Sequence, residues 1–199
     1  MRTKQPQKQK RPSPDTMCYI GIDFSINSPG VSISFADVVI THVFNFESLI
    51  VLKPVERWDT LTDQIVSYIL RHGGIFKSTI FIEDYAMGGK GRTNDIAECC
   101  GLLKFKLYKV GLSLDQLKFV SIAHLKQFVA GIGNAKKELM LKEVFKKWGY
   151  DTNDNNAADA YAIMKVCRAF HNVEKVTADQ KKIMAKIITY NTPKKKKKK

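Results

Sequence analysis

Apolar residues gather in short runs in the first part of the chain, and the residue types in these runs are typical of β-strands. Runs at 18–24, 31–35 and 38–46 follow one another across short polar breaks, which predicts three consecutive antiparallel strands. Two later runs, at 79–82 and 117–121, are expected to be buried strands. The pattern therefore predicts five strands.

Four longer stretches place apolar residues at helical spacing. They cover residues 58–70, 96–110, 134–148 and 157–171. Asn134 is the expected N-cap of the third stretch, and Gly149 ends it. Strands and helices in this order predict an α/β fold with one mixed five-stranded sheet and helices on both faces.

Length and charge divide the chain into one domain and two basic ends. The chain has 199 residues, and 44% of them are apolar, enough for one hydrophobic core within residues 17–171. Residues 1–16 combine five Lys and Arg with almost no apolar side chain, so a disordered basic tail is expected. Residues 172–199 are expected to form an extension, with a short helix before six consecutive lysines. The net charge of +14 makes a polyanion the expected partner.

Two absences in the sequence bear on where the protein acts. No stretch reaches about 18 consecutive apolar residues, and residues 1–16 lack the hydrophobic segment of a secretory signal. No pair among the four cysteines has the spacing of a zinc or redox motif. We therefore expect no membrane partner and a reducing compartment. This is the cytoplasm of a bacterium or of a phage-infected cell, or the nucleus if the host is eukaryotic.

Three acidic residues stand where a strand or helix reaches an edge of the predicted sheet. Asp23 ends the first strand, Glu83 ends the fourth, and Asp159 lies between small alanines at the start of the last helix. Each of them alone is an ordinary turn or helix-start residue. Brought together they repel one another unless a cation is present, and carboxylates without a His or Cys cluster favour Mg²⁺ or Mn²⁺. The joint pattern predicts a site for two such ions, which would bind a phosphodiester.

These acids and the stretch 126–137 resemble a known family. The stretch has a Lys-Gln start, a Gly-x-Gly turn and a following lysine, and the last helix starts with Ala-Ala-Asp-Ala. Across residues 18–170, approximately, the chain is similar to the RuvC-like Holliday junction resolvases of the RNase H superfamily. The resemblance implies an RNase H-like fold.

The resemblance also implies a reaction and the residues that carry it. The expected enzyme is a crossover junction endodeoxyribonuclease, a Mg²⁺-dependent phosphodiester hydrolase. As a homodimer it would resolve four-way DNA junctions by paired symmetric nicks. The implied metal ligands are Asp23, Glu83 and Asp159, and the implied basic residues that serve cleavage are Lys126 and Lys137.

One position of the implied metal site departs from the family. The family usually has an acid three residues before its last aspartate, and here that residue is Asn156. An amide oxygen still coordinates Mg²⁺, so Asn156 is a candidate fourth ligand. Asp154 either takes that role or caps the last helix.

Candidate contacts to DNA lie in two segments. The glycine-rich segment 85–92 carries an aromatic residue that would wedge against unpaired bases and two basic residues that would touch a strand. The lysines of 126–137 suit phosphate groups. The candidates are Tyr85, Lys90, Arg92, Lys126, Lys136 and Lys137.

The stripe of apolar residues within 96–110 has two competing destinations. The resemblance places the dimer contact on Ile96, Cys100, Leu103 and Leu107, whereas the same stripe suits the protein's own core.

Two other functions fit the same residues. Another nuclease of the RNase H fold, acting on flaps or other branched nucleic acids, would keep the metal site and change the partner. A non-catalytic DNA-binding scaffold would use the basic surface alone, and the neutral side chain of Asn156 favours it.

Overall fold

A computed structural model describes residues 13, 16–75, 77–84 and 93–192 of the chain. Most of the expected N-terminal tail and the final lysines lie outside the described residues. So do three of the candidate DNA contacts, Tyr85, Lys90 and Arg92.

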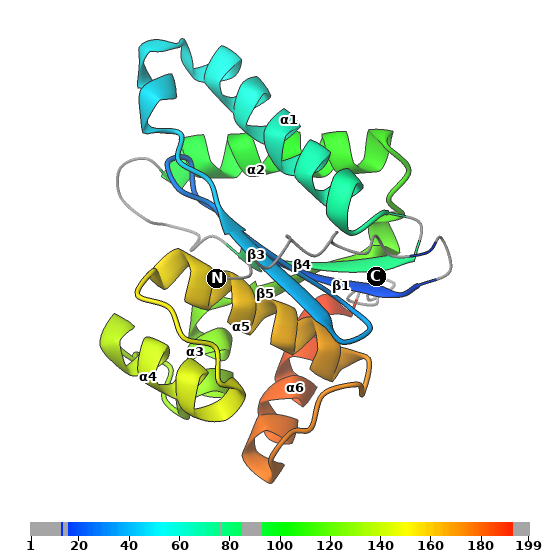
Figure 1. Ribbon diagram of the computed structural model, residues 1–199, viewed down its shortest axis with the longest axis vertical. Helices are drawn as coiled ribbons and strands as arrows, with labels where there is room; N and C mark the ends of the chain where they lie inside the picture. Colours follow the sequence, from blue (N-terminus) through cyan, green and yellow to red (C-terminus); the bar gives the residue numbers. More distant parts are fainter. Residues whose placement is uncertain (1–12, 14–15, 76, 85–92, 193–199) are drawn as a thin grey trace, which may run out of the picture.

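The five predicted strands form one mixed sheet in the order β3-β2-β1-β4-β5 (Figure 1). β1, β2 and β3 are antiparallel neighbours, whereas β4 and β5 run parallel to β1. The strands are β1 (Cys18–Asp23), β2 (Gly30–Phe35), β3 (Val38–Val43), β4 (Ser78–Asp84) and β5 (Leu117–Ser121). β1, β4 and β5 therefore end at one common edge of the sheet, where ligand sites of α/β folds usually lie.

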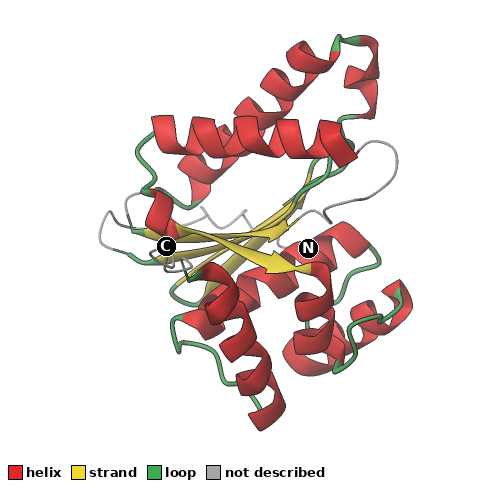
Figure 2. Cartoon of the chain, turned by 180° about the vertical axis from the view of Figure 1, so that it is seen from behind, coloured by secondary structure: helices red, strands yellow, loops and turns green. Residues whose placement is uncertain are grey.

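Helices cover both faces of the sheet, as the sequence predicts (Figures 1 and 2). One face carries α1 (Pro54–His72) and α2 (Thr93–Lys109). The other face carries α3 (Ile122–Ala130), α4 (Lys137–Trp148), α5 (Asn155–Phe170) and α6 (Ala178–Asn191). Two short 3₁₀ helices lie in the connections, η1 (Glu47–Val51) and η2 (Leu114–Gln116). No described helix is both long enough and apolar enough to cross a membrane.

The expected start of the third long helix is wrong, and one helix was not predicted. α3 follows β5 without a loop, and the Ser121 hydroxyl caps it by accepting a hydrogen bond from the His124 amide at 3.3 Å. α3 ends at Gly131, which has a left-handed φ of 80°. α4 then begins after Lys136 and not after Asn134, because Ala135 is buried in the core and fixes the turn before the helix.

The predicted dimer face on α2 is corrected by burial. Cys100, Leu103 and Leu107 are fully buried against α1 and the sheet, and Ile96 packs at the border of this core. The apolar stripe of α2 therefore packs in the core of this chain and is not a dimer contact.

α5 lies unusually close to the sheet, because two strand positions facing it have no side chain. A Cβ on Gly21 would stand 2.2 Å from the Met164 amide nitrogen, and one on Gly30 would stand 2.4 Å from the Asn156 carbonyl oxygen. Alanines in α5, including Ala160, complete this close contact. The small residues thus bring the start of α5 to the edge where β1 and β4 end.

Candidate active site

Asp23 and Glu83 stand next to each other at the carboxyl ends of two paired strands. β1 and β4 are parallel with Ile22 opposite Ile82, so the next residue of each strand is one of the two acids. Phe81, two residues before Glu83, packs in the core beneath α5. Since side chains alternate along a strand, Glu83 points to the α5 side of the sheet.

Asp159 joins these two acids from the first turns of α5. Burial and the negative charges of Glu83 and Asp159 hold the pKa of Asp23 well above its ordinary value. Burial and Asp159 likewise raise the pKa of Glu83 to about 7. Burial also raises the pKa of Asp159 to about 6. The structure therefore brings the three predicted acids into one half-buried group whose members repel.

Two predicted lysines face this acidic group from neighbouring helices. Lys126 in α3 acts on Glu83 and Asp159, and Lys137 at the start of α4 acts on Asp23 and Asp159; each lowers the pKa of the acids it faces. Lys136 is the N-cap residue of α4 and is exposed to solvent. All three acids keep a raised pKa despite these positive charges, and the largest cause for each is burial.

The three carboxylates are ligands that a hard divalent cation prefers, although their side chains are not arranged as a complete metal site. Within the described part of the chain, no group of three or more His, Cys, Asp and Glu is placed to hold a metal ion. Three half-buried carboxylates that repel one another nevertheless have the chemistry that Mg²⁺ or Mn²⁺ prefers.

Asp154 and Asn156, the two candidates for a fourth metal ligand, make hydrogen bonds to other parts of the protein. The Asp154 carboxylate caps α5 by accepting hydrogen bonds from the amides of Asn156 (2.8 Å) and Ala157 (3.1 Å). The Asn156 side chain donates to Ser28 in the turn between β1 and β2. Asp154 and Asn156 line a polar depression of about 490 Å³, together with Lys137, Asn153 and Asn155.

Asp84, the residue after Glu83, makes a contact with the last helix. Its carboxylate accepts a hydrogen bond from the Tyr190 hydroxyl of α6. Asn191, the next residue, bonds both the amide and the carbonyl of Phe119, each at 2.8 Å. The end of α6 thus covers the outer edge of β5 beside the acidic group, a role that sequence reasoning did not assign to it.

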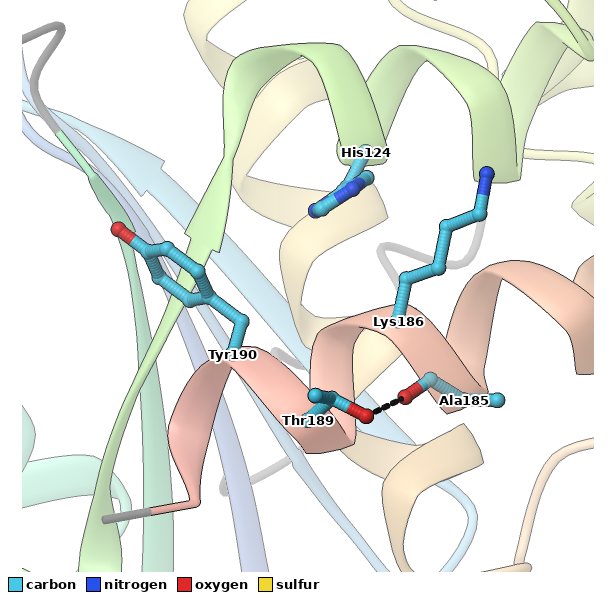
Figure 3. Close-up of a pocket in the computed structure, with 5 residues that line it drawn as sticks. All are labelled: His124, Ala185, Lys186, Thr189 and Tyr190. Atoms are coloured by element: carbon cyan, nitrogen blue, oxygen red, sulfur yellow. Dashed lines mark hydrogen bonds between the residues drawn. The ribbon is translucent and has the colours of Figure 1, made fainter. Parts of the chain in front are cut away.

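A second hollow lies between α3 and α6 (Figure 3). It has a volume of about 410 Å³ and is lined by His124, Ala185, Lys186, Thr189 and Tyr190. Burial and the charge of Lys186 lower the pKa of His124, so the imidazole is neutral at physiological pH.

Comparison with known proteins identifies the fold. No family model matches the sequence, and no curated protein matches it. Among solved structures, Thermus thermophilus RuvC superposes with a TM-score of 0.59 at 18% identity, covering 81% of this chain and 100% of that one. The chain has the fold of RuvC. T. thermophilus RuvC in complex with Holliday junction substrate gives a TM-score of 0.61 at 17% identity, covering 81% and 99%.

The RuvC similarity confirms the RNase H-like α/β fold that the sequence predicts. At identities of 18% and 17% the similarity is one of fold. The structure places three acids and two lysines together at the sheet edge where β1, β4 and β5 end.

Proposed function

We propose that this protein is a metal-dependent endonuclease that resolves four-way DNA junctions by paired nicks. One observation carries the proposal: Asp23, Glu83 and Asp159, distant in the sequence, form one repelling acidic group faced by Lys126 and Lys137. The RuvC fold supports it, since one neighbour with that fold was solved with a Holliday junction substrate.

Asp23, Glu83 and Asp159 are the residues that would hold two Mg²⁺ or Mn²⁺ ions. When bound, such ions supply Lewis acidity to the scissile phosphodiester. With pKa values of about 7 and about 6, Glu83 and Asp159 take up protons near neutral pH, and a bound proton competes with a cation for the carboxylate. Lys126 and Lys137 favour the ionised form of the acids, which is the form that binds cations.

The two lysines have a second use during cleavage. Negative charge grows on the phosphate oxygens as the phosphodiester is attacked, and nearby ammonium groups stabilise that charge. Lys126 and Lys137 approach from different helices, so they would contact the substrate strand from two sides. Lys136 and the basic ends of the chain would add affinity that is independent of sequence and sensitive to salt.

Paired nicks require two active sites, so the proposal includes a homodimer. With its apolar stripe in the core, α2 turns Phe105 and Tyr108 to solvent, 59% and 55% exposed. They stand three residues apart and therefore share one face of the helix. Large exposed aromatic residues on one helix face are typical of a protein interface. We propose this outer face of α2 as the dimer contact.

Cleavage of a synthetic four-way junction tests the function. The protein is incubated with the junction or with a linear duplex of the same sequence, with and without Mg²⁺, beside the Asp23→Asn variant. The proposal predicts symmetric nicks in the junction only, with Mg²⁺ only, and none by the variant. Equal cutting of both substrates would instead indicate a general nuclease of this fold. Junction binding without cleavage would indicate a scaffold.

A further inference from the structure

One side chain connects the start of α5 to the turn that follows Asp23. The Asn156 side-chain nitrogen donates to the Ser28 carbonyl oxygen at 2.9 Å and to the Ser28 hydroxyl oxygen at 2.8 Å. Asn156 lies three residues before Asp159, on the same side of α5. The contact therefore joins the two elements that carry Asp23 and Asp159.

The partners of this contact fix which way the amide of Asn156 faces. The Ser28 carbonyl can only accept a hydrogen bond, so the Asn156 nitrogen, and not its oxygen, must face the turn. A direct metal ligand would need the oxygen. The observed contact uses the other end of the amide.

The turn is held from the opposite side as well. Arg57 of α1 is 7% exposed, and its guanidinium donates to the Ile26 carbonyl at 3.0 Å and to the Asn27 side chain at 2.6 Å. The Phe46 amide donates to the Asn27 carbonyl at 2.8 Å. With these contacts the turn is already fixed to α1 and to the segment after β3. Asn156 adds the side-chain connection to α5.

This connection works against an electrostatic force. Asp23 and Asp159 repel each other, which tends to separate the end of β1 from the start of α5. The hydrogen bonds of Asn156 span these two elements one helical turn from Asp159. They oppose the separation at the point where it would occur.

We propose that Asn156 is a positioning residue: it ties α5 to the turn after Asp23 and so sets the distance between Asp23 and Asp159. The inference rests on the proposed function, because it assigns a purpose to that distance in binding divalent cations. It replaces the fourth-ligand role that the sequence suggests for Asn156.

Substitution by aspartate separates the two roles. Asn156→Asp keeps the side-chain oxygen Oδ1 and replaces the nitrogen that donates to Ser28 with an acceptor oxygen, whereas Asn156→Ala removes both groups. A ligand role predicts Mg²⁺ binding at least as tight as in the parent protein for Asn156→Asp. A positioning role predicts that Asn156→Asp is as impaired as Asn156→Ala. Asn155→Asp is the matched control, since it adds the same charge at the neighbouring helix position.

The readout is the Mg²⁺ concentration that gives half-maximal junction cleavage, together with the Mg²⁺ dependence of the melting temperature without DNA. Loss of a group that orients metal ligands typically weakens metal binding by roughly 10- to 100-fold. We expect a shift of this size for both Asn156 variants and a much smaller one for Asn155→Asp. We also expect the cleavage rate at saturating Mg²⁺ to recover in Asn156→Ala, because the reacting groups remain.

Tight Mg²⁺ binding and normal cleavage by Asn156→Asp would overturn the inference. If the parent protein neither cleaves nor binds Mg²⁺, the proposed function fails instead, and the metal-free melting temperature still tests the tie. In that case a double-mutant cycle of Asn156→Ala with Ser28→Ala must show coupling. Additive effects would exclude the hydrogen bond to the Ser28 hydroxyl, which Ser28→Ala removes. Unchanged melting in Asn156→Ala would contradict the whole tie, including the bond to the Ser28 carbonyl.

Discussion

The acidic side chains at the sheet edge lower the free energy of unfolding of the protein. Glu83 is buried beside another acid, and its pKa is raised to about 7 from an ordinary 4.5. The folded protein therefore binds more protons than the unfolded chain between these two values. By linkage, the free energy of unfolding falls as the pH rises through this window. Carboxylates that repel one another in this way are typical of sites where function requires charge.

Glu83→Gln should therefore stabilise the metal-free protein at pH 8. The amide removes a buried charge, and we expect a gain of about 1 to 3 kcal/mol in the free energy of unfolding. At pH 4 the gain should be close to zero, because Glu83 is then protonated in the folded protein. Urea denaturation at both pH values, without divalent cations, measures the difference.

Asp37→Asn, at an exposed position in the β2–β3 turn, is the control for this experiment. It should show no comparable gain at pH 8. An equal gain from Glu83→Gln at pH 4 and pH 8 would show that its charge is not strained in the folded state.

The sequence predicts the position of single site residues better than it predicts the contacts between them. The placement of Asp23, Glu83 and Asp159 near one another could be predicted because each stands at the start or end of an element that its own pattern defines, while their role as metal ligands stays a prediction. The Asn156 to Ser28 contact could not be predicted, since it joins residues 128 positions apart and depends on how α5 lies on the sheet. The hydrogen bond from Tyr190 to Asp84 could not be predicted for the same reason.

At the scale of elements, the distance between α5 and the sheet sets the position of Asp159. Gly21 permits that distance, because any side chain there would meet the backbone of Ala160 and Met164. Backbone atoms cannot move aside as a flexible side chain can. The glycine thus allows a helix to place its carboxylate beside the ends of two strands.

Gly21→Ala should therefore destabilise the fold and weaken metal binding together. We expect a loss of at least about 2 kcal/mol, in the upper range for overpacked cores. Gly101→Ala in α2 is the matched control, since its added Cβ meets nothing within 4 Å. It should be neutral or stabilising by about 0.5 to 1 kcal/mol. Thermal unfolding of both variants tests this, and equal effects would contradict the close contact.

Most elements could be predicted because their patterns are strong. The strands were placed within three residues at each end, and the helix ends at Gly111 and Gly149 nearly so. The nine-residue α3 has too few turns for a clear period and starts directly from a strand. The N-cap at Asn134 was wrong because burial of Ala135 overrides a local capping preference.

At the scale of the whole molecule, the core decides which face of α2 is left for a partner. An apolar stripe in a sequence does not reveal whether it meets the same chain or a second copy. Leu103 and Leu107 are buried in the core of the same chain, so the apolar stripe of α2 is not available to a second copy. Phe105 and Tyr108 lie on the solvent-exposed face of the helix. The proposed dimer thus depends on a tertiary contact that sequence spacing alone cannot supply.

Phe105→Glu should convert the protein to a monomer and leave its fold intact. A charge at the centre of an apolar contact is costly for association, and an exposed position tolerates it in the monomer. Phe145→Glu in α4 is the control, because Phe145 is similarly exposed at 55% on another face. Sedimentation equilibrium should show a dimer for the parent protein and Phe145→Glu only. A dimer that persists in Phe105→Glu would place the contact elsewhere.

We propose that three acids distant in the sequence form one cation site at the sheet edge. Anomalous diffraction from crystals soaked in Mn²⁺ tests it directly, because the metal is located without reference to activity. We expect two peaks about 3.5 to 4 Å apart, contacted by Asp23, Glu83 and Asp159 and close to Lys126. No peak at saturating Mn²⁺, or peaks only at other acidic residues, would contradict it.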